Sequence, residues 1–301
     1  MTRAGSPAQG VASVAVAPRS PAGELRTRLL TALVLIPTFL VAVALGREFF
    51  LGAAMALACV GAWEFLTMAA RKPNPVRRLP GVTLAVAFPA AFYWGWGSPS
   101  VIVTLLTVAV TGVALAQLLT AGARESIGGV SVTVFAAAYV GLLFGHFVLV
   151  REIAREMPGA AYWVGGALLA IPLGLTWTND TAAYVIGKRW GRRRLAPAVS
   201  PGKSLEGALG ALVVTIAVAV PLLWLVDRWV PVFTAVDGFA LGLLVGVTAP
   251  CGDLVESAFK RDAGVKDVSQ LVPGHGGVLD RFDSLLFTVP AFYYYVREIV
   301  L

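Results

Sequence analysis

Two pairs of carboxylates stand at the ends of apolar stretches in the last third of the chain. Asp253 and Glu256 form the first pair, and Asp280 and Asp283 form the second. Residues three apart share one face of a helix, and ionisable side chains at membrane depth mark functional sites by default. Carboxylate oxygens hold hard cations such as Mg²⁺, while bases neutralise phosphate oxygens. The acids therefore indicate a site for a Mg²⁺-bound polyphosphate, with these basic residues nearby: Lys260, Arg261, Lys266 and Arg281.

Two glycine-containing segments add a second signal for phosphate. Residues 273–277 read Pro-Gly-His-Gly-Gly, and glycines expose backbone N–H groups to an anion. In this segment His275 is a candidate hydrogen-bond donor or proton shuttle. Residues 200–204 read Ser-Pro-Gly-Lys-Ser. Ser204 could cap the following helix, whereas Lys203 beside a glycine suits a phosphate. Either segment alone is also compatible with a simple turn.

The composition places these motifs in a membrane protein. Hydrophobic residues make up 57% of the 301 residues and charged residues 14%, against about 45–50% and about 25% in soluble domains. So few charges cannot cover so much apolar surface, which excludes disordered, coiled-coil, collagen-like and secreted disulfide-rich chains. Cys59 and Cys251 lie in apolar surroundings and are expected to pack as small hydrophobes. The net charge of +7 indicates loops beside anionic lipid and no nucleic-acid partner.

Continuous apolar runs, without period-two alternation, predict an all-α polytopic integral membrane helical bundle. Residues 1–24 are rich in Ala, Pro, Ser and Gly and predict a disordered N-terminal tail. With the N-terminus in the cytoplasm, 19 of the 24 Lys and Arg residues fall on the inner side, which fits an odd number of spans. The two motif-rich loops then share the cytoplasmic face and can meet. About nine transmembrane helices are expected, at about 29–46, 49–70, 80–96, 100–120, 129–150, 161–187, 205–226, 236–259 and 284–300.

Taken together, the motifs resemble a known family signature. The stretches Ser257–Arg261, Lys266–Asp267 and Pro273–Asp283 resemble the signature of the phosphatidate cytidylyltransferases, the CDP-diacylglycerol synthases. One block departs slightly: Gly202 stands where a Lys is common, and Ser204 stands where a Thr is common. The resemblance covers roughly residues 29–301 and is strongest after about residue 175. Further similarity lies in Trp63-Glu64-Phe65, Asn179-Asp180-Thr181, Ala183-Tyr184, Gly187, Ser200-Pro201, Lys203 and Glu206-Gly207.

The resemblance implies an integral membrane nucleotidyltransferase. The phosphate of phosphatidic acid would attack the α-phosphorus of CTP, giving CDP-diacylglycerol and pyrophosphate, with Mg²⁺ required and a second cation left open. Such a transfer needs positioning and charge neutralisation more than covalent chemistry. The implied transmembrane cytidylyltransferase domain covers residues 25–301, with its catalytic part at about 175–301. It would lie in a bacterial inner membrane, with the active site facing the cytoplasm.

The resemblance also implies roles for individual residues. The implied catalytic residues are Asp253, Asp280, Lys260, Arg261, His275 and Arg281. The implied substrate-binding residues are Asn179, Asp180, Ser200, Pro201, Lys203, Lys266, Gly276 and Gly277. The implied metal ligands are Asp253, Asp280 and Asp283.

Each role has a structural alternative. Asp280 could form a salt bridge with Lys260 or Arg281, and Glu64 is either a paired structural acid or a substrate contact. His146 is expected to pack in the core. A cytidylyltransferase or kinase for another lipid is the first alternative function. A lipid transporter is the second, and it predicts inverted repeats and acids at the bilayer midplane. A homodimer is left open.

Overall fold

The computed structural model describes residues 33–34, 37–73, 76–95, 98–121, 126–271 and 276–301. The expected N-terminal tail and His275 lie outside these residues. Residues 37–45 are helical. The elements that follow are α2 (Arg47–Ala69), α3 (Arg78–Gly95), α4 (Pro99–Ala121), α5 (Ser126–Ala136), η1 (Ala137–Leu142), α6 (Leu143–Glu152), η2 (Ile153–Glu156), α7 (Trp163–Trp190), β1 (Arg194–Ala196), β2 (Ser200–Ser204), α8 (Leu205–Val226), α9 (Ala235–Asp262), α10 (Leu279–Tyr295) and η3 (Val296–Val300).

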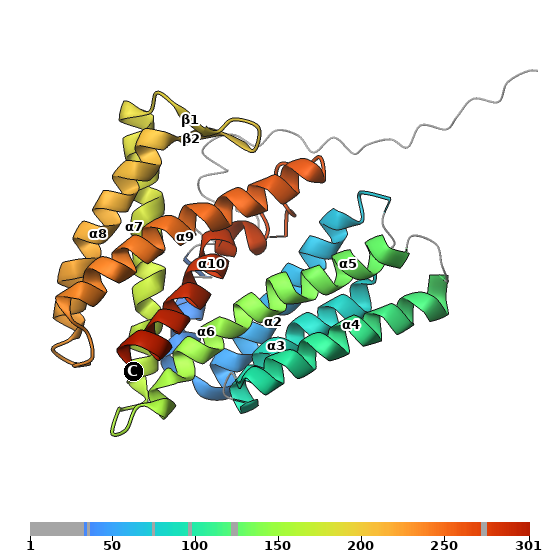
Figure 1. Ribbon diagram of the computed structural model, residues 1–301, viewed down its shortest axis with the longest axis horizontal. Helices are drawn as coiled ribbons and strands as arrows, with labels where there is room; N and C mark the ends of the chain where they lie inside the picture. Colours follow the sequence, from blue (N-terminus) through green and yellow to red (C-terminus); the bar gives the residue numbers. More distant parts are fainter. Residues whose placement is uncertain (1–32, 35–36, 74–75, 96–97, 122–125, 272–275) are drawn as a thin grey trace, which may run out of the picture.

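The helices form two groups that meet along α10. In Figure 1, α7 and α8 stand on one side with the β1–β2 hairpin, and α2 to α5 lie on the other side. Helices α9 and α10 run between them, and α10 packs against α6, α7 and α9. The last helix therefore connects the N-terminal half of the bundle to the half that carries most of the motifs.

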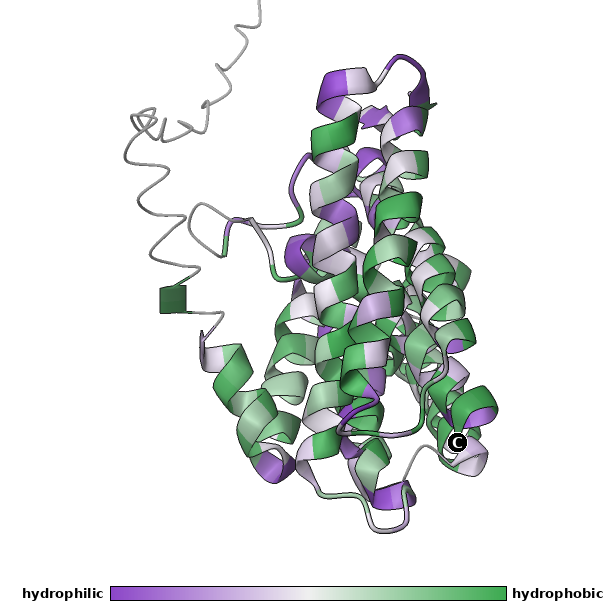
Figure 2. Cartoon of the chain, turned by 90° about the vertical axis from the view of Figure 1, so that its left-hand side faces the viewer, coloured by the Kyte–Doolittle hydropathy of each residue, from purple (hydrophilic) through white to green (hydrophobic). Residues whose placement is uncertain are grey.

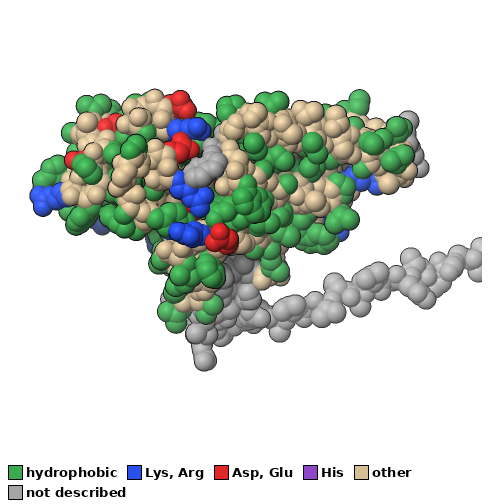
Figure 3. All heavy atoms as spheres, turned by 90° about the horizontal axis from the view of Figure 1, so that it is seen from below, with side chains coloured by type: hydrophobic (Ala, Val, Ile, Leu, Met, Phe, Trp, Pro, Cys, Tyr) green, Lys and Arg blue, Asp and Glu red, His purple; other side chains and the backbone are tan. Residues whose placement is uncertain are grey.

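The helices coincide with the apolar runs, because a continuous apolar run satisfies its backbone internally as a helix. Each expected range overlaps a helix of the described residues. Of these helices, five stretches are long and apolar enough to cross a membrane, so the expected count of about nine is not confirmed. They are Arg47–Ala69, Pro99–Thr120, Ser126–Glu156, Leu205–Val226 and Ala235–Asp262. Figure 2 shows hydrophobic residues along the middle of the helices and hydrophilic segments towards their ends. Seen from below in Figure 3, charged side chains gather in a short strip between hydrophobic surfaces.

A small hairpin departs from the expected all-helical fold. Strands β1 and β2 pair antiparallel, with Arg194 opposite Ser204 and Ala196 opposite Ser200. Ser204 then caps α8, because its hydroxyl accepts a hydrogen bond from the backbone N–H of Gly207 at 3.1 Å. The capping role expected for Ser204 is confirmed. The hairpin holds the loop between α7 and α8 in a defined shape beside α9.

A buried arginine joins three segments at the end of the bundle opposite the hairpin. Arg151 on α6 is 1% exposed. Its guanidinium donates to the carbonyl oxygens of Val43 at 2.7 Å and Tyr162 at 3.2 Å. Gly46 and Gly165 leave room for it, since a Cβ on Gly46 would lie 2.3 Å from the guanidinium and a Cβ on Gly165 would lie 1.9 Å from the Arg151 carbonyl oxygen. Arg151 therefore fixes the end of the first helical segment and the start of α7 against α6.

Candidate active site

The carboxylates and bases singled out in the sequence converge where the C-terminal half of α9 meets the start of α10. Helical spacing places Asp253, Ser257 and Lys260 along one face of α9, and the Ser257 hydroxyl donates to Asp253 Oδ1 at 3.2 Å. Lys203 on β2 forms an ion pair with Asp253. The Arg261 guanidinium donates to the carbonyl oxygen of Val199 in the hairpin at 3.3 Å. The two motif-rich loops are therefore in contact, as the topology predicted.

Lys260 is the centre of this polar cluster. Its ammonium group lies 2.7 Å from Asp280 Oδ1 and 3.1 Å from Glu256 Oε1. Lys260 is 9% exposed and Glu256 is 1% exposed. Buried charges are tolerated when they are paired and hydrogen-bonded, and Lys260 meets this condition. The alternative anticipated for Asp280, a salt bridge with Lys260, is present in the structure.

Asp280 also closes a loop. Its second oxygen, Oδ2, accepts hydrogen bonds from the backbone N–H groups of Gly277 at 2.8 Å and Val268 at 3.0 Å. Asp280 precedes the expected span at 284–300. Burial alone would raise the pKa of its carboxyl. The hydrogen bond from Lys260 and the two backbone N–H groups outweigh burial, so that the pKa is held below its ordinary value. Gly276 adopts φ +83°, and a Cβ there would lie 2.9 Å from Asp280 Oδ2.

Glu64, on α2, fastens the same loop from the other half of the bundle. Its carboxylate accepts hydrogen bonds from the Ser269 hydroxyl at 2.5 Å and from the backbone N–H groups of Val278 at 3.1 Å and Leu279 at 3.0 Å. These N–H groups belong to the start of α10, where helices have unpaired donors that favour a negative charge. A Cβ on Gly277 would lie 2.8 Å from Glu64 Oε2. The structure therefore assigns Glu64 a paired structural position.

Further carboxylates surround the Lys203–Asp253 ion pair. Asp253 repels Asp180 on α7 and Asp283 on α10 electrostatically. Gly252 permits this arrangement, because a Cβ there would lie 2.4 Å from the backbone oxygen of Asp283. The close approach of α9 and α10 at this glycine brings the acids together.

The donor set fits a hard cation in its chemistry, because carboxylate oxygens are the ligands that Mg²⁺ prefers. Within the described ranges, no group of three His, Cys, Asp or Glu side chains is close enough together to hold a metal ion. Asp280 already uses both oxygens on Lys260 and backbone N–H groups. Ser257 and Lys203 contact the Asp253 oxygens, but the Asp253 side chain is 30% exposed, against 6% for Asp280. Asp253 is therefore the more accessible candidate for a metal ligand, and Asp283 on α10 lies close enough to repel it.

The remaining expected residues fall into three groups. Asn179 is buried between α7 and α8, where its amide donates to the Thr215 hydroxyl at 3.0 Å. Lys266 and Arg281 are exposed, and Arg281 directly follows Asp280 in the sequence. Ser200 and Pro201 belong to β2, beside α9.

Sequence reasoning missed Val268 and Ser269, which anchor one end of the loop that Asp280 and Glu64 close. Neither residue has a side chain or spacing that distinguishes it from an ordinary turn. His146 packs as expected: it is 2% exposed, and its ring lies 2.8 Å from the Leu142 carbonyl oxygen.

Comparison with known proteins places this geometry in a family. A model described as "Cytidylyltransferase family" matches residues 26–299. The chain is 35% identical to the phosphatidate cytidylyltransferase of Pseudomonas aeruginosa over 89% of this chain and 95% of that protein. It is also 35% identical to the phosphatidate cytidylyltransferase of Haemophilus influenzae over 90% of this chain and 98% of that protein. A shorter match, 49% identical over 44% of each chain, is to the uncharacterised protein YnbB of Escherichia coli.

The apolar helices and the charged cluster define a helical membrane protein with a polar site suited to an anionic ligand. The family match then defines the class more narrowly. The chain belongs to the cytidylyltransferase family and is a nucleotidyltransferase.

Proposed function

We propose that this protein transfers a cytidylyl group from CTP to phosphatidic acid, giving CDP-diacylglycerol and pyrophosphate for phospholipid synthesis. The main support is the cluster around Lys260, where three motif segments distant in sequence meet. The relatives in Pseudomonas and Haemophilus, which match 89% and 90% of this chain, are named for that activity.

The chain's own residues suit a transfer between two anionic substrates. Lys203 pairs with Asp253, Lys260 pairs with Asp280 and Glu256, and the neighbouring residues Arg261 and Arg281 add positive charge. Transfer of a phosphoryl-type group depends on positioning and on neutralising phosphate oxygens. The lipid phosphate is the nucleophile, so no nucleophilic side chain is needed.

Mg²⁺ is part of this proposal, with a second cation left open. Asp253 and Asp283 would hold it, with Asp180 nearby and Asp280 fixing the adjacent loop. Bound Mg²⁺ would supply charge neutralisation at the phosphates. The carboxylates of Asp180, Asp253 and Asp283 repel one another, and a bound cation would relieve that repulsion.

We also propose the finer membrane arrangement: about nine spans in a bacterial inner membrane, with the N-terminus and the Lys260 cluster at the cytoplasmic face. The 19 basic residues on one side support this orientation. Cysteine-accessibility labelling from each side of oriented vesicles tests it, and labelling of the hairpin from the outside would contradict it.

The activity is tested with purified protein, CTP, phosphatidic acid and Mg²⁺, by measuring pyrophosphate release and CDP-diacylglycerol formation. Chelation of the divalent cation is expected to abolish turnover. Competing lipids, such as a prenyl phosphate, decide between phosphatidic acid and another acceptor. Absence of any CTP-dependent product would refute the proposal.

The metal assignment is tested by Asp253→Asn. Asp237→Asn, at the opposite end of the same helix, is the matched control, because Asp237 serves the capping box with Thr234. We expect the first variant to lose at least 100-fold in kcat and to need more Mg²⁺. The control is expected to keep its kcat and to lose only stability. Equal activity of the two variants would contradict the role of Asp253.

A further inference from the structure

The hydroxyl of Tyr139 is buried without a hydrogen-bond partner among the described residues. Tyr139 is 6% exposed, and an unpaired buried hydroxyl is costly and rare in native proteins. It lies on η1, a six-residue π-helical turn between α5 and α6. Such turns occur frequently at functional sites. The position therefore suggests a ligand that the hydroxyl contacts.

The Tyr139 ring separates an apolar region from the charged cluster. On one side it stacks on Phe135, with ring centroids 5.5 Å apart. It also makes an edge-to-face contact with Phe259, with ring centroids 5.4 Å apart. On the other side it lies within electrostatic range of Glu256 and Asp283. Glu256 Oε2 is also buried without a hydrogen-bond partner in the described part of the chain. Two side chains that influence each other electrostatically thus each carry a buried polar atom without a hydrogen-bond partner among the described residues.

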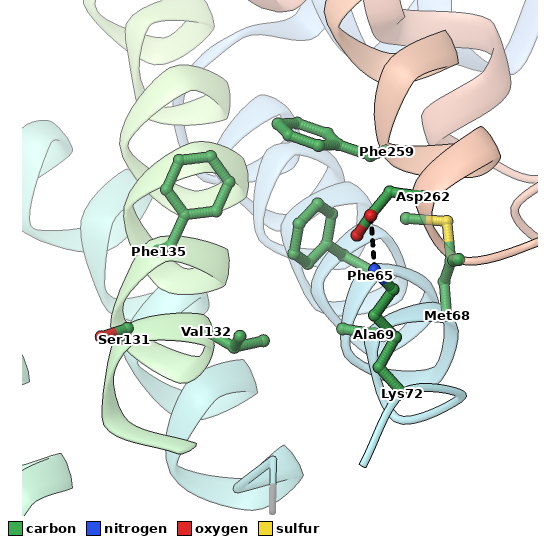
Figure 4. A pocket seen from close by; sticks show the side chains of 10 residues that line it. Phe65, Met68, Ala69, Lys72, Ser131, Val132, Phe135, Phe259 and Asp262 are labelled. Carbon is green, nitrogen blue, oxygen red and sulfur yellow. Dashed lines mark hydrogen bonds and ion pairs between the residues drawn. The ribbon is translucent and has the colours of Figure 1, made fainter. Parts of the chain in front are cut away.

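The apolar region includes a pocket between α2, α5 and α9, which we call the α9 pocket. It has a volume of about 420 Å³. Figure 4 shows Phe65, Phe135 and Phe259 around it, with the ion pair of Lys72 and Asp262 at one side. The rings of Phe65 and Phe259 contact the Tyr139 ring from the pocket side, with ring centroids 5.6 Å and 5.4 Å from its centroid. Two of the rings that line the pocket therefore also contact Tyr139.

We propose that the α9 pocket and Tyr139 bind the lipid substrate, an inference that rests on the proposed function. One fatty chain lies in the pocket, and the Tyr139 hydroxyl donates a hydrogen bond to a phosphate or ester oxygen at the head of that chain. This occupant matches both sides of Tyr139, because a phospholipid joins an apolar chain to an anionic head. The ammonium group of Lys260, which pairs with Glu256, supplies positive charge for the anionic head of the lipid.

Tyr139→Phe tests the polar contact, since it removes only the hydroxyl. A hydrogen bond to a charged group corresponds to about ten-fold or more in affinity. We expect the KM for phosphatidic acid to rise by at least that factor, the KM for CTP to stay unchanged, and the melting temperature in detergent not to fall. Tyr295→Phe is the matched control, because the Tyr295 hydroxyl donates to Asp237 at 2.8 Å. That variant should melt earlier and keep its lipid KM. An unchanged lipid KM in Tyr139→Phe would overturn the contact, and would instead indicate that water bridges Tyr139 and Glu256.

Ala69→Phe tests the pocket, because Ala69 lines it. We expect a larger increase in KM for a phosphatidic acid with sixteen-carbon chains than for a six-carbon analogue. Ala114→Phe, exposed on α4, is the control and should change neither. An equal effect of Ala69→Phe on both lipids would overturn the pocket assignment.

Direct binding separates this inference from the proposed function. Native mass spectrometry of the wild-type protein with phosphatidic acid, without CTP, measures lipid occupancy alone. Occupancy that Tyr139→Phe and Ala69→Phe both lower supports the inference even if CTP turnover is absent, in which case only the proposed reaction fails. Occupancy that neither variant lowers overturns the inference.

Discussion

Replacing Glu64 by Gln is the sharpest test of how the N-terminal half of the bundle supports the site. The Glu64 carboxylate accepts three hydrogen bonds, two of them from the backbone N–H groups of Val278 and Leu279. Gln keeps one acceptor oxygen but turns an NH₂ group towards one of these donors. At least one charge-assisted hydrogen bond is therefore lost at the start of α10.

The expected size follows from that count. A hydrogen bond to a charged acceptor contributes about 1.5–3 kcal/mol, and Leu279 is fully buried, so water does not replace the lost partner. A cost of about 2–3 kcal/mol corresponds to a factor of about 30 to 150 in rate. This cost falls on the loop that presents Gly277 and Asp280, so we expect the loss in kcat/KM rather than in folding alone.

Steady-state cytidylyl transfer, together with the melting temperature in detergent, measures both effects. Glu48→Gln is the matched control on the same helix: Glu48 is exposed and accepts a single side-chain hydrogen bond, from Tyr93, at 3.0 Å. The control is expected to stay within about three-fold of wild type, as surface substitutions usually do. If Glu64→Gln matched this control in kcat/KM, the proposed support of the loop would be refuted.

Three further changes test other contacts. Gly252→Ala places a Cβ 2.4 Å from a backbone oxygen of α10 and should destabilise the fold by about 1–3 kcal/mol. Gly112→Ala, which has open space around it, is the control and should not destabilise the fold. Equal melting temperatures of the two variants would contradict this prediction. Lys203→Gln leaves Asp253 without its ion-pair partner and should raise the KM for CTP at least ten-fold in the transfer assay. An unchanged KM would remove Lys203 from the nucleotide site. Arg151→Met leaves buried carbonyl oxygens unpaired and should cost about 3 kcal/mol or more of stability, with kcat per folded molecule unchanged. A melting temperature equal to that of wild type would contradict the assigned role of this arginine.

The helices were predictable from the sequence because membrane helices need only local apolar runs. The cap at Ser204 was also predictable, since an N-cap depends on residues three apart. The number of spans was not, because α3, α7 and α10 fall outside the group that is long and apolar enough by itself. Packing against neighbouring helices, rather than hydropathy, holds such segments in place.

The members of the charged cluster were predictable, but their pairings were not. The motifs indicated that Lys260, Asp253 and Asp280 act together. Nothing in the spacing showed that Lys203 faces Asp253, or that Glu64 reaches Leu279, 215 positions away. These contacts depend on how α2, β2 and α10 pack, which is a property of the whole bundle. Sequence reasoning therefore identified the chemistry of the site better than its geometry.

The position of Arg151 has a consequence for biosynthesis. Val43 and Ala44 lie in the last turn of the first helical segment, and Arg151 donates hydrogen bonds to the carbonyl oxygens of both. A ribosome completes these residues more than 100 positions before it reaches Arg151. During synthesis, the carbonyl oxygens of Val43 and Ala44 therefore have no hydrogen bond from Arg151 until α6 has been made. Arg151 is in turn synthesised before Tyr162, its third partner. The early helices should therefore remain movable relative to one another until Tyr162 and the start of α7 have been synthesised.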